Sequence, residues 1–374
     1  MNIHYIYIII SFLASIICGV IFIPQIMNYC KRKKLYDIPN ERKVHKNAIP
    51  RLGGLSFLPS MVIAVLVALL VFDGISGKEQ VTLSLWTCLF FISLLLTYTV
   101  GIIDDLIGLN ATTKFLVQIL SASLMPLSGL YINNLYGFLG MHEIPVWVGM
   151  ILTVFIIVFI ENAINLIDGI DGLAGGLCFL GLAGFLACFI SEDMWSYSIL
   201  IAGLMGVVVA FLYFNMLGDP QKNRKIFMGD SGSLTLGFIL GFLFVKLAMD
   251  NPNIKPYRSD RLLLSFTFLM VPMLDVVRVV ITRTVNHRPL FDADKNHIHH
   301  KLMRSGMDQH HALITILAVA VLFTTVNIML NKLCDASLTL ILIIDVVLYV
   351  ALNYAINLSI RRRGEKPFVK REEA

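Results

Sequence analysis

The chain has 374 residues, of which 57% are apolar and 15% are charged, and its formal net charge is +5. Soluble domains average roughly 45–50% apolar and about 25% charged residues, so this composition excludes an ordinary soluble globular protein. The apolar residues fall in runs of about 18–25, the length that a helix needs to cross the hydrocarbon core of a bilayer. The sequence therefore predicts an all-α polytopic membrane protein that forms a single domain over residues 1–374.

Eleven transmembrane helices are predicted. In chain order they cover residues 4–28, 52–73, 82–103, 114–132, 145–162, 173–190, 195–215, 232–249, 261–282, 312–330 and 336–360. The first is not expected to be a cleaved signal peptide, because no basic region precedes it and no small-residue cleavage pattern follows it. The six cysteines show no paired spacing, which argues against a disulfide framework or a zinc site.

Basic residues set the predicted orientation. They concentrate in the loop after the first helix and in the basic tail at 361–374. Because Lys and Arg stay preferentially on the cytoplasmic side, we expect the N-terminus outside and the C-terminus in the cytoplasm. The predicted cytoplasmic loops are 31–51, 101–114, 162–176, 216–234 and 283–311. Their charge suits anionic lipid better than nucleic acid, since the chain has no basic, aromatic-rich soluble domain.

The concentrated carboxylates, amides, glycines and histidines all fall in these cytoplasmic loops, which predicts one composite site on the cytoplasmic face. The stretch GIIDDLIG ends the third predicted helix with Asp104 and Asp105. Carboxylates at membrane depth usually mark a functional site, although a pair solvated in the loop is the alternative. Adjacent residues on a helix point about 100° apart, so the two acids are expected to have different tasks. Lys114 opens the next helix against the helix dipole and therefore needs an anionic partner, either these aspartates or a ligand phosphate.

The stretch NAINLIDGID follows the fifth apolar run and carries four polar residues spaced three apart: Asn162, Asn165, Asp168 and Asp171. Steps of three residues place each side chain about 60° from the previous one on a helix, so the four are neighbours. Amide and carboxylate oxygens are hard ligands that suit magnesium, which also works with substrate phosphates. Helix capping and hydrogen bonding between helices are the alternative interpretation.

The stretch FMGDSGSL places Asp230 between two glycines that allow the backbone to approach a ligand closely. It opens the eighth predicted helix, whose N-terminus favours an anion. Phe227 lies in the same loop and could stack on a flat ring, with ordinary anchoring at the membrane interface as the alternative.

The stretch NHIHH contributes His297, His299 and His300, with lysines on either side. The sequence has no His-Glu-x-x-His spacing there, and lysines repel a metal, so phosphate binding or proton handling is the better interpretation. Asp275 and Arg278, three residues apart in the ninth predicted helix, are expected to form an intramembrane ion pair with a structural role.

Together these motifs resemble the polyprenyl-phosphate N-acetylhexosamine-1-phosphate transferase family. Five motifs occur in the order typical of the family: PRLGG, DDLIGLNATTK, NAINLIDGIDGLAGG, FMGDSGS and NHIHH. The resemblance extends over roughly residues 30–305. It implies that a lipid phosphate attacks the β-phosphorus of a UDP-sugar and displaces UMP, with Mg²⁺ as cofactor and Mn²⁺ as an alternative ion. Whether the reaction takes one displacement or two is left open.

The resemblance also implies roles for individual residues. It assigns Asp104, Asp105 and Asp168 to catalysis, Asn165 and Asp230 to the metal, and Lys114, Asn162, Asp171, Phe227, His297, His299 and His300 to the substrate. Within that set, Lys114 is expected to contact phosphate and Phe227 to stack on uracil. The expected setting is the bacterial cytoplasmic (inner) membrane, with polyprenyl phosphate and a UDP-sugar as partners, no nucleic acid, and a homodimer as an open option.

The choice of sugar remains open at this point. The last motif reads His-Ile-His-His, which is similar to the enzymes that use GlcNAc and argues against UDP-MurNAc-pentapeptide. UDP-GlcNAc is therefore the expected donor, with other UDP-N-acetylhexosamines as alternatives. Two other classes of protein are alternatives. An ion-coupled transporter would place its acids near the midplane and show repeat symmetry between its halves, and a lipid-binding scaffold would not need the cluster of metal-ligand residues.

Overall fold

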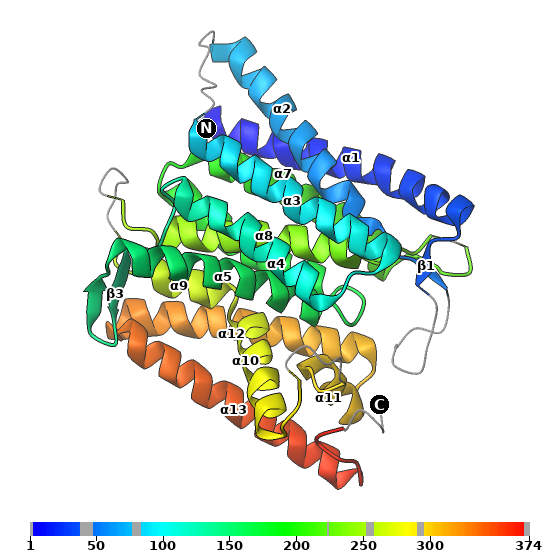
Figure 1. Ribbon diagram of the computed structural model, residues 1–374, viewed down its shortest axis with the longest axis vertical. Helices are drawn as coiled ribbons and strands as arrows, with labels where there is room; N and C mark the ends of the chain where they lie inside the picture. The colour runs from blue at the N-terminus through cyan, green and yellow to red at the C-terminus, as the bar shows by residue number, and fades with distance from the viewer. Residues whose placement is uncertain are drawn as a thin grey trace.

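The computed structural model describes residues 3–37, 48–76, 84–222, 224–251, 258–289 and 295–369. Within those ranges the chain is built almost entirely of helices (Figure 1). The α-helices are α1 (Ile3–Lys33), α2 (Phe57–Ser76), α3 (Leu85–Ile107), α4 (Ala111–Leu127), α5 (Val146–Ile167), α6 (Leu173–Ser191), α7 (Trp195–Met216), α8 (Gly229–Ala248), α9 (Arg261–Phe268), α10 (Met270–Val285), α11 (Ile298–Arg304), α12 (Gln309–Cys334) and α13 (Leu338–Arg362). A short 3-10 helix, η1 (Gly53–Ser56), leads into α2.

Two small antiparallel hairpins accompany the helices, and neither was predicted. One pairs β1 (Tyr36–Asp37) with β2 (Ile49–Pro50), and the other pairs β3 (Asn134–Phe138) with β4 (Met141–Glu143). The prediction of an all-α membrane protein is therefore correct apart from these short strands. The seven-residue helix α11, in the loop of the histidine motif, was not predicted either.

Nine helices in the described ranges are long and apolar enough to cross a membrane, or ten if the bent pair α9–α10 counts as one span. These nine and the bent pair lie on ten of the eleven predicted spans, and α4, with 17 residues, lies on the remaining one. The structure thus supports a polytopic membrane protein, while the count of eleven remains a prediction.

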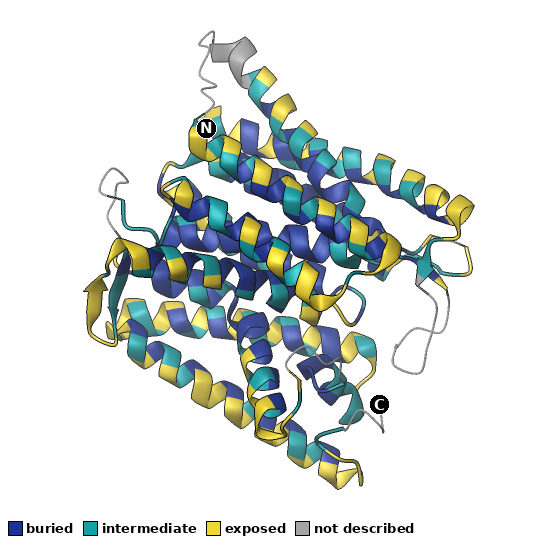
Figure 2. Cartoon of the chain, in the orientation of Figure 1, coloured by how far each residue is buried: buried dark blue, intermediate teal, exposed yellow. Residues whose placement is uncertain are grey.

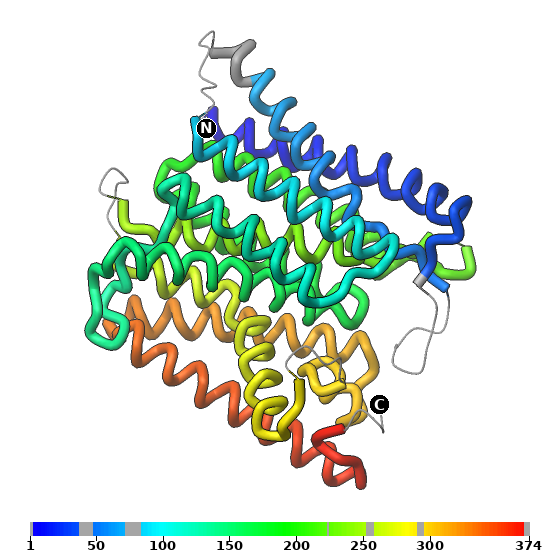
Figure 3. The backbone as a smooth tube through the Cα atoms, viewed as in Figure 1, coloured from blue at the N-terminus to red at the C-terminus, as the bar shows by residue number. Residues whose placement is uncertain are grey.

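The ninth predicted span, 261–282, is broken into two helices and is not one continuous helix. The chain breaks at Leu269 and turns by 71° between α9 and α10. Pro272 explains the break, because it has no N–H to donate to the carbonyl of Phe268 and its ring crowds that carbonyl. Helix α10 therefore leaves the direction of the other helices and runs across the bundle towards α13, as the backbone trace shows (Figure 3).

Helix α8 is the centre of the bundle. Of its most apolar 18-residue window, 94% is buried, whereas the corresponding windows of α12 and α13 are 22% and 28% buried. Figure 2 shows the same contrast, with α8 dark blue and the outer helices striped with exposed residues that suit contact with lipid. Glycines permit the close packing: a side-chain carbon on Gly237 would lie 2.6 Å from the Cα of Glu161 in α5.

The two ends of the bundle differ. In Figure 1 the N-terminus and the β3–β4 hairpin lie at the left end, whereas β1, α11 and the C-terminus lie at the right end. At the right end α3 and α5 finish and α4 and α8 begin. The fold therefore brings the polar motifs of the sequence to one end of the molecule.

Candidate active site

The predicted polar residues meet where these helix ends converge, and Lys114 is at the centre of the contacts. Its Nζ atom lies 2.7 Å from Asp230 Oδ1, 3.1 Å from Asp104 Oδ2 and 3.5 Å from Asn165 Oδ1. The three oxygens come from α3, α5 and α8, and the lysine comes from the first turn of α4. Lys114 thus has the aspartate partners that its position against the helix dipole required.

The donor set around Lys114 suits a hard cation. Asn165 Nδ2 donates to Asp230 Oδ1 and to Ser233 Oγ, so the amide and the carboxylate are in direct contact. Three oxygens already converge on one positive charge, the lysine ammonium. Among the described residues no group of three or more His, Cys, Asp or Glu side chains forms a metal-binding cluster. Mg²⁺ does not require one, because it usually takes one or two carboxylates together with water and substrate phosphates. Asn165 and Asp230 therefore fit the magnesium prediction.

The two adjacent aspartates have different surroundings, as their angular separation on α3 predicted. Asp105 is 4% exposed, and its two carboxylate oxygens accept hydrogen bonds from the backbone N–H groups of Asp230 (2.8 Å) and Ser231 (2.9 Å). It therefore caps the N-terminus of α8, where a negative charge also complements the helix dipole. Asp104 instead contacts Lys114 and accepts the N–H of Leu109. Asp104 is thus the member of the pair that faces the cluster.

The PRLGG motif supports the same turn of α8. Gly53 N–H donates to Phe227 O (2.9 Å), Gly54 N–H donates to Met228 O (2.8 Å), and Phe227 N–H donates to the carbonyl of Pro50 (2.8 Å). A side-chain carbon on Gly54 would lie 2.0 Å from the backbone nitrogen of Gly232. The motif therefore has a structural task, which is to hold the backbone on both sides of Phe227 and the start of α8.

The turn between α5 and α6 carries Asp168 and Asp171. Gly172 closes it in the left-handed conformation (φ 78°), and its N–H donates to Asn215 Oδ1 at 2.7 Å. The same Asn215 donates to the carbonyl of Ile226 at 2.9 Å, so it joins this turn to the segment that precedes α8. Asn215 was missed in the sequence, although a lone amide at the end of an apolar run was a signal that could have been used.

Lys225 was missed as well. Its Nζ lies 2.6 Å from Asp171 Oδ2, and both side chains are largely buried. The two residues are 54 positions apart, so no local spacing connects them. This ion pair places a cation two residues before Phe227, on the side of the site where the sequence predicts the nucleotide.

Asp168 lies among other carboxylates at the end of α5. The residue as a whole is exposed to water at the turn. Its carboxyl group nevertheless has many protein atoms around it. This crowding, followed by the negative charges of Asp230, Asp171 and Asp105, raises the pKa of Asp168 to about 7. The acid can therefore change protonation state near neutral pH.

Residues 296–300, which we call the histidine segment, pack against the turn between α5 and α6. His299 is 1% exposed, and a side-chain carbon on Gly169 would lie 2.1 Å from its Nε2 atom. Burial, with smaller effects from His300 and His297, lowers the pKa of His299 well below its usual range, so its ring is neutral. The glycine of the Asp-Gly-Ile-Asp turn is thus needed to make room for a histidine 130 positions later in the chain.

Two predicted residues stand somewhat apart from the cluster. Asn162 donates to Gln118 Oε1 (3.0 Å) and to the carbonyl of Val158 (2.8 Å), which is the bond between helices given above as its alternative role. Phe227 is half-buried and its backbone is fixed, but a stacking role for its ring remains a prediction. The predicted ion pair of Asp275 and Arg278 is confirmed, with 2.7 Å between Oδ1 and Nη2.

Hard oxygen ligands, a lysine and the neutral, buried His299 lie together at one end of the helices, an arrangement typical of a membrane enzyme that binds phosphate groups. Comparison with known proteins gives the same class. The model of the family described as glycosyl transferase family 4 matches residues 86–248. That range contains Asp104, Asp105, Lys114, Asn165 and Asp230.

Curated relatives match most of the chain. The probable undecaprenyl-phosphate N-acetylglucosaminyl 1-phosphate transferase of Bacillus subtilis (strain 168) is 33% identical over 333 residues, which cover 87% of this chain and 85% of the relative. The decaprenyl-phosphate N-acetylglucosaminephosphotransferase of Mycobacterium tuberculosis (strain CDC 1551 / Oshkosh) is 32% identical over 74% of this chain and 71% of its own length. The undecaprenyl-phosphate alpha-N-acetylglucosaminyl 1-phosphate transferase of Yersinia pestis is 26% identical over 80% and 78%. This chain therefore belongs to glycosyl transferase family 4, and the resemblance inferred from the five motifs is confirmed.

The capping role of Asp105 predicts a separation between stability and activity. We expect Asp105→Ala to lower the free energy of unfolding by about 1–2 kcal/mol, because two N–H groups of α8 lose their acceptor. Asp104→Ala is the matched control, because its carboxylate accepts one backbone N–H, from Leu109, and it should cost less stability. Thermal unfolding of both variants in detergent measures the difference. Equal losses for the two variants would contradict a capping role.

Proposed function

We propose that this protein transfers GlcNAc-1-phosphate from UDP-GlcNAc to undecaprenyl phosphate and releases UMP. An oxygen of the lipid phosphate forms the new bond to the β-phosphorus, and the bond between that phosphorus and the bridging oxygen breaks as UMP leaves. The names of the relatives give undecaprenyl phosphate and an N-acetylglucosaminyl 1-phosphate group, and UDP-GlcNAc is consistent with them as the donor. The observation that carries the proposal is the contact of Lys114 with Asp104, Asp230 and Asn165 at the ends of four helices.

Phosphoryl transfer asks little covalent chemistry of a protein and depends on positioning and on charge stabilisation. Asn165 and Asp230 would hold Mg²⁺, which when bound neutralises and orients the diphosphate. Lys114 adds a second positive charge next to the same carboxylate (2.7 Å). A lipid phosphate at a membrane interface also explains why the cluster lies at helix ends and not in the middle of the bundle.

Of the paired aspartates, Asp104 is the one that we assign to the lipid phosphate. Both oxygens of Asp105 are engaged by the backbone of α8, which leaves Asp105 poorly placed to attack phosphorus or to accept a proton. Asp104 shares Lys114 with Asp230, so a phosphate that takes over the lysine comes next to the Asp104 carboxylate. This arrangement favours a direct attack by the lipid phosphate.

The nucleotide is assigned to the neighbouring side of the site. Phe227 stands there in a backbone held by the PRLGG segment, and Lys225, which pairs with Asp171, lies two residues before it in the chain. We propose that the Phe227 ring stacks on uracil and that His299 and His300 contact the diphosphate or the sugar.

In the membrane we propose eleven spans, an N-terminus outside and the site in the cytoplasm of a bacterial cell. The site, the basic end of α1 and the basic end of α13 share one end of the bundle (Figure 1), which favours that end as the cytoplasmic one. A homodimer is part of the proposal, and the transfer is the first membrane step in the synthesis of an envelope polysaccharide.

Turnover is the direct test of the function. Purified protein with undecaprenyl phosphate and UDP-GlcNAc should release UMP in the presence of Mg²⁺, and EDTA should stop the release until Mg²⁺ is restored in excess. Asp230→Ala should lower the rate by at least about 100-fold, because it removes both the metal ligand and the partner of Lys114. Other UDP-N-acetylhexosamines, assayed alongside, should be slower than UDP-GlcNAc. Absence of UMP release with every donor would refute the function, and a faster alternative donor would refute the choice of sugar.

The raised pKa of Asp168 predicts a pH dependence. If the carboxylate is the working form, kcat/KM should fall towards about one tenth for each pH unit below its pKa, because protonation removes that form. Asp171→Asn removes one of the negative charges that raise this pKa, so the acid limb of the profile should move to lower pH. Rates of UMP release between pH 5.5 and about pH 8.5 provide the measurement. A shift of the limb to higher pH would show that another group controls it.

The orientation can be tested with a natural cysteine. Cys334, the last residue of α12, is exposed and lies on the predicted outer side. A membrane-impermeant thiol reagent should label Cys334 on intact cells, and a Cys334→Ser variant gives the background from the other cysteines. Lys222→Cys in the opposite loop, added to that variant, should react only after permeabilisation. The reverse pattern would invert the proposed topology.

A further inference from the structure

Asp275 has more contacts than an ion pair with Arg278. None of its surface is exposed, and it lies in the buried face of α10. Its Oδ1 atom accepts hydrogen bonds from Arg278 Nη2 (2.7 Å), Ile298 N (3.0 Å) and the Tyr349 hydroxyl (3.1 Å). Its Oδ2 atom lies 2.8 Å from His297 Nδ1. A buried carboxylate is costly in free energy unless partners of this kind compensate its charge. Two of the four contacts of Asp275 are with the histidine segment, at His297 and Ile298.

Arg278 also binds the histidine segment. Its Nη2 atom also donates to the carbonyl of Asn296 at 2.5 Å. Asp275 and Arg278 therefore bind three consecutive residues, Asn296, His297 and Ile298, where α11 begins. A seven-residue helix is not stable on its own. The residue at its N-cap position, His297, makes no side-chain hydrogen bond to the backbone of the first turn. The carboxylate of Asp275 supplies that acceptor from another helix.

The contact also fixes the chemistry of the His297 ring. An ionised carboxylate only accepts hydrogen bonds, so Nδ1 must carry the hydrogen that lies between the two groups. The Nε2 atom is then the nitrogen that remains for other partners. A change of the acceptor at residue 275 would therefore change which nitrogen of His297 is protonated.

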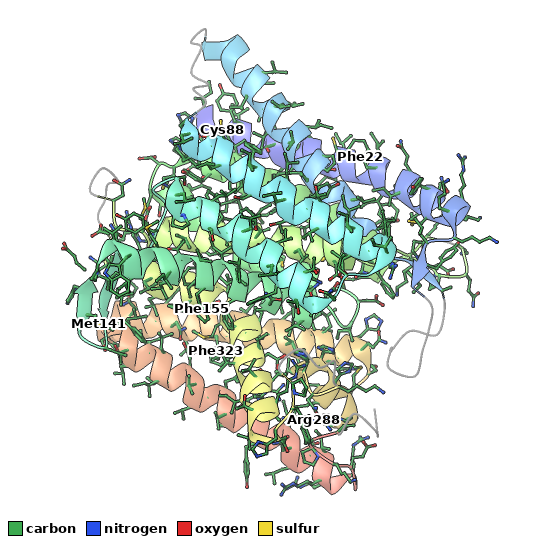
Figure 4. The ribbon with its side chains drawn as sticks, in the orientation of Figure 1. Phe22, Cys88, Met141, Phe155, Arg288 and Phe323 are labelled. Carbon is green, nitrogen blue, oxygen red and sulfur yellow. The ribbon has the colours of Figure 1, made fainter. Side chains whose placement is uncertain are left out.

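From His297 the contacts lead to the site. The rings of His297 and His299 are nearly parallel, with 8° between their planes and 6.0 Å between their centroids, and His300 lies 4.2 Å from His299. His299 packs directly against Gly169, next to Asp168. Figure 4 marks Arg288 just beyond α10, on the side where α11 and α13 lie, so α10 and the histidine segment occupy the same corner of the molecule. The start of α11 thus determines where the histidines face the site.

We propose that Asp275 is a positioning residue for the transfer reaction: it holds His297 with hydrogen on Nδ1 and fixes the first turn of α11, so that His299 packs against the Asp168–Gly169 turn with His300 beside it. This inference rests on the proposed function, because it concerns the same site. It goes beyond the structural role that the spacing of Asp275 and Arg278 suggested.

The test is the isosteric change Asp275→Asn. The carboxamide can keep its shape and one acceptor, but it no longer presents an anion to His297 Nδ1. We expect kcat for UMP release to fall about 10–100-fold, as for carboxylates that orient other imidazoles, while KM for UDP-GlcNAc changes less than about threefold. In a His297→Ala background the same change should cost little more, because its effect passes through His297.

Asp345→Asn is the matched control. Asp345 is also fully buried in a helix, α13, and accepts a hydrogen bond from Asn327 at 2.8 Å, but Asn327 lies in α12 and not in the histidine segment. A general loss of stability from an altered buried acid should affect both variants alike. The positioning role is contradicted if Asp275→Asn is as active as Asp345→Asn, or if the effects of Asp275→Asn and His297→Ala multiply.

A second readout does not depend on turnover. In protein labelled with ¹⁵N-histidine, the spectrum should contain a resonance of a protonated Nδ1 that is lost in His297→Ala and changed to the other tautomer in Asp275→Asn. An unchanged tautomer in Asp275→Asn overturns the inference. Wild-type protein that shows this tautomer but releases no UMP would refute the proposed function and leave the contact of Asp275 with His297 established.

Discussion

The N-terminus of α8 is the structural point on which the site depends. Three elements hold it: Asp105 of α3 accepts its first N–H groups, the backbone of the PRLGG segment pairs with the residues just before it, and Gly54 lets η1 approach within backbone contact. These contacts fix Asp230, because it is the second residue of the helix. A helix N-terminus carries partial positive charge, so α8 can bring a carboxylate to a negatively charged region at lower cost than an uncapped loop could. The most buried helix of the protein therefore also presents the carboxylate assigned to the metal.

Charge balance gives this arrangement its chemical purpose. Five carboxylates gather near the helix ends, those of Asp104, Asp105, Asp168, Asp171 and Asp230, and the cations paired with them by contact are Lys114 and Lys225. Burial of the carboxyl, followed by these negative charges, raises the pKa of Asp168, and the buried His299 beside it is neutral and brings no compensating charge. A region with this excess of negative charge attracts a divalent cation and repels a free diphosphate. The diphosphate can bind only when positive charge accompanies it, which links nucleotide binding to the metal that Asn165 and Asp230 would hold.

Much of this could be predicted from the sequence, because the underlying signals are local. Apolar runs of membrane length located the helices, and the angular separation of adjacent residues predicted that Asp104 and Asp105 would differ. Contacts between distant segments could not be predicted in this way. Lys225 is 54 residues from Asp171, and Asn215 is 43 residues from Gly172, so no helical or turn spacing relates them. The packing of His299 on Gly169 is visible only in three dimensions, because the two residues are far apart in the chain.

The break between α9 and α10 is the clearest error of the sequence-based prediction, and it has a functional consequence. A straight helix over 261–282 would have continued parallel to its neighbours. Pro272 prevents that by removing a backbone donor, and the 71° turn sends α10 across the bundle towards α13. Asp275 lies one turn beyond Pro272, where it meets Tyr349 of α13 and the start of α11 at the same time. An unbent helix could not bring one carboxylate to both. Pro272 thus has two effects: it breaks the predicted transmembrane helix, and the resulting turn places Asp275 next to the histidine segment.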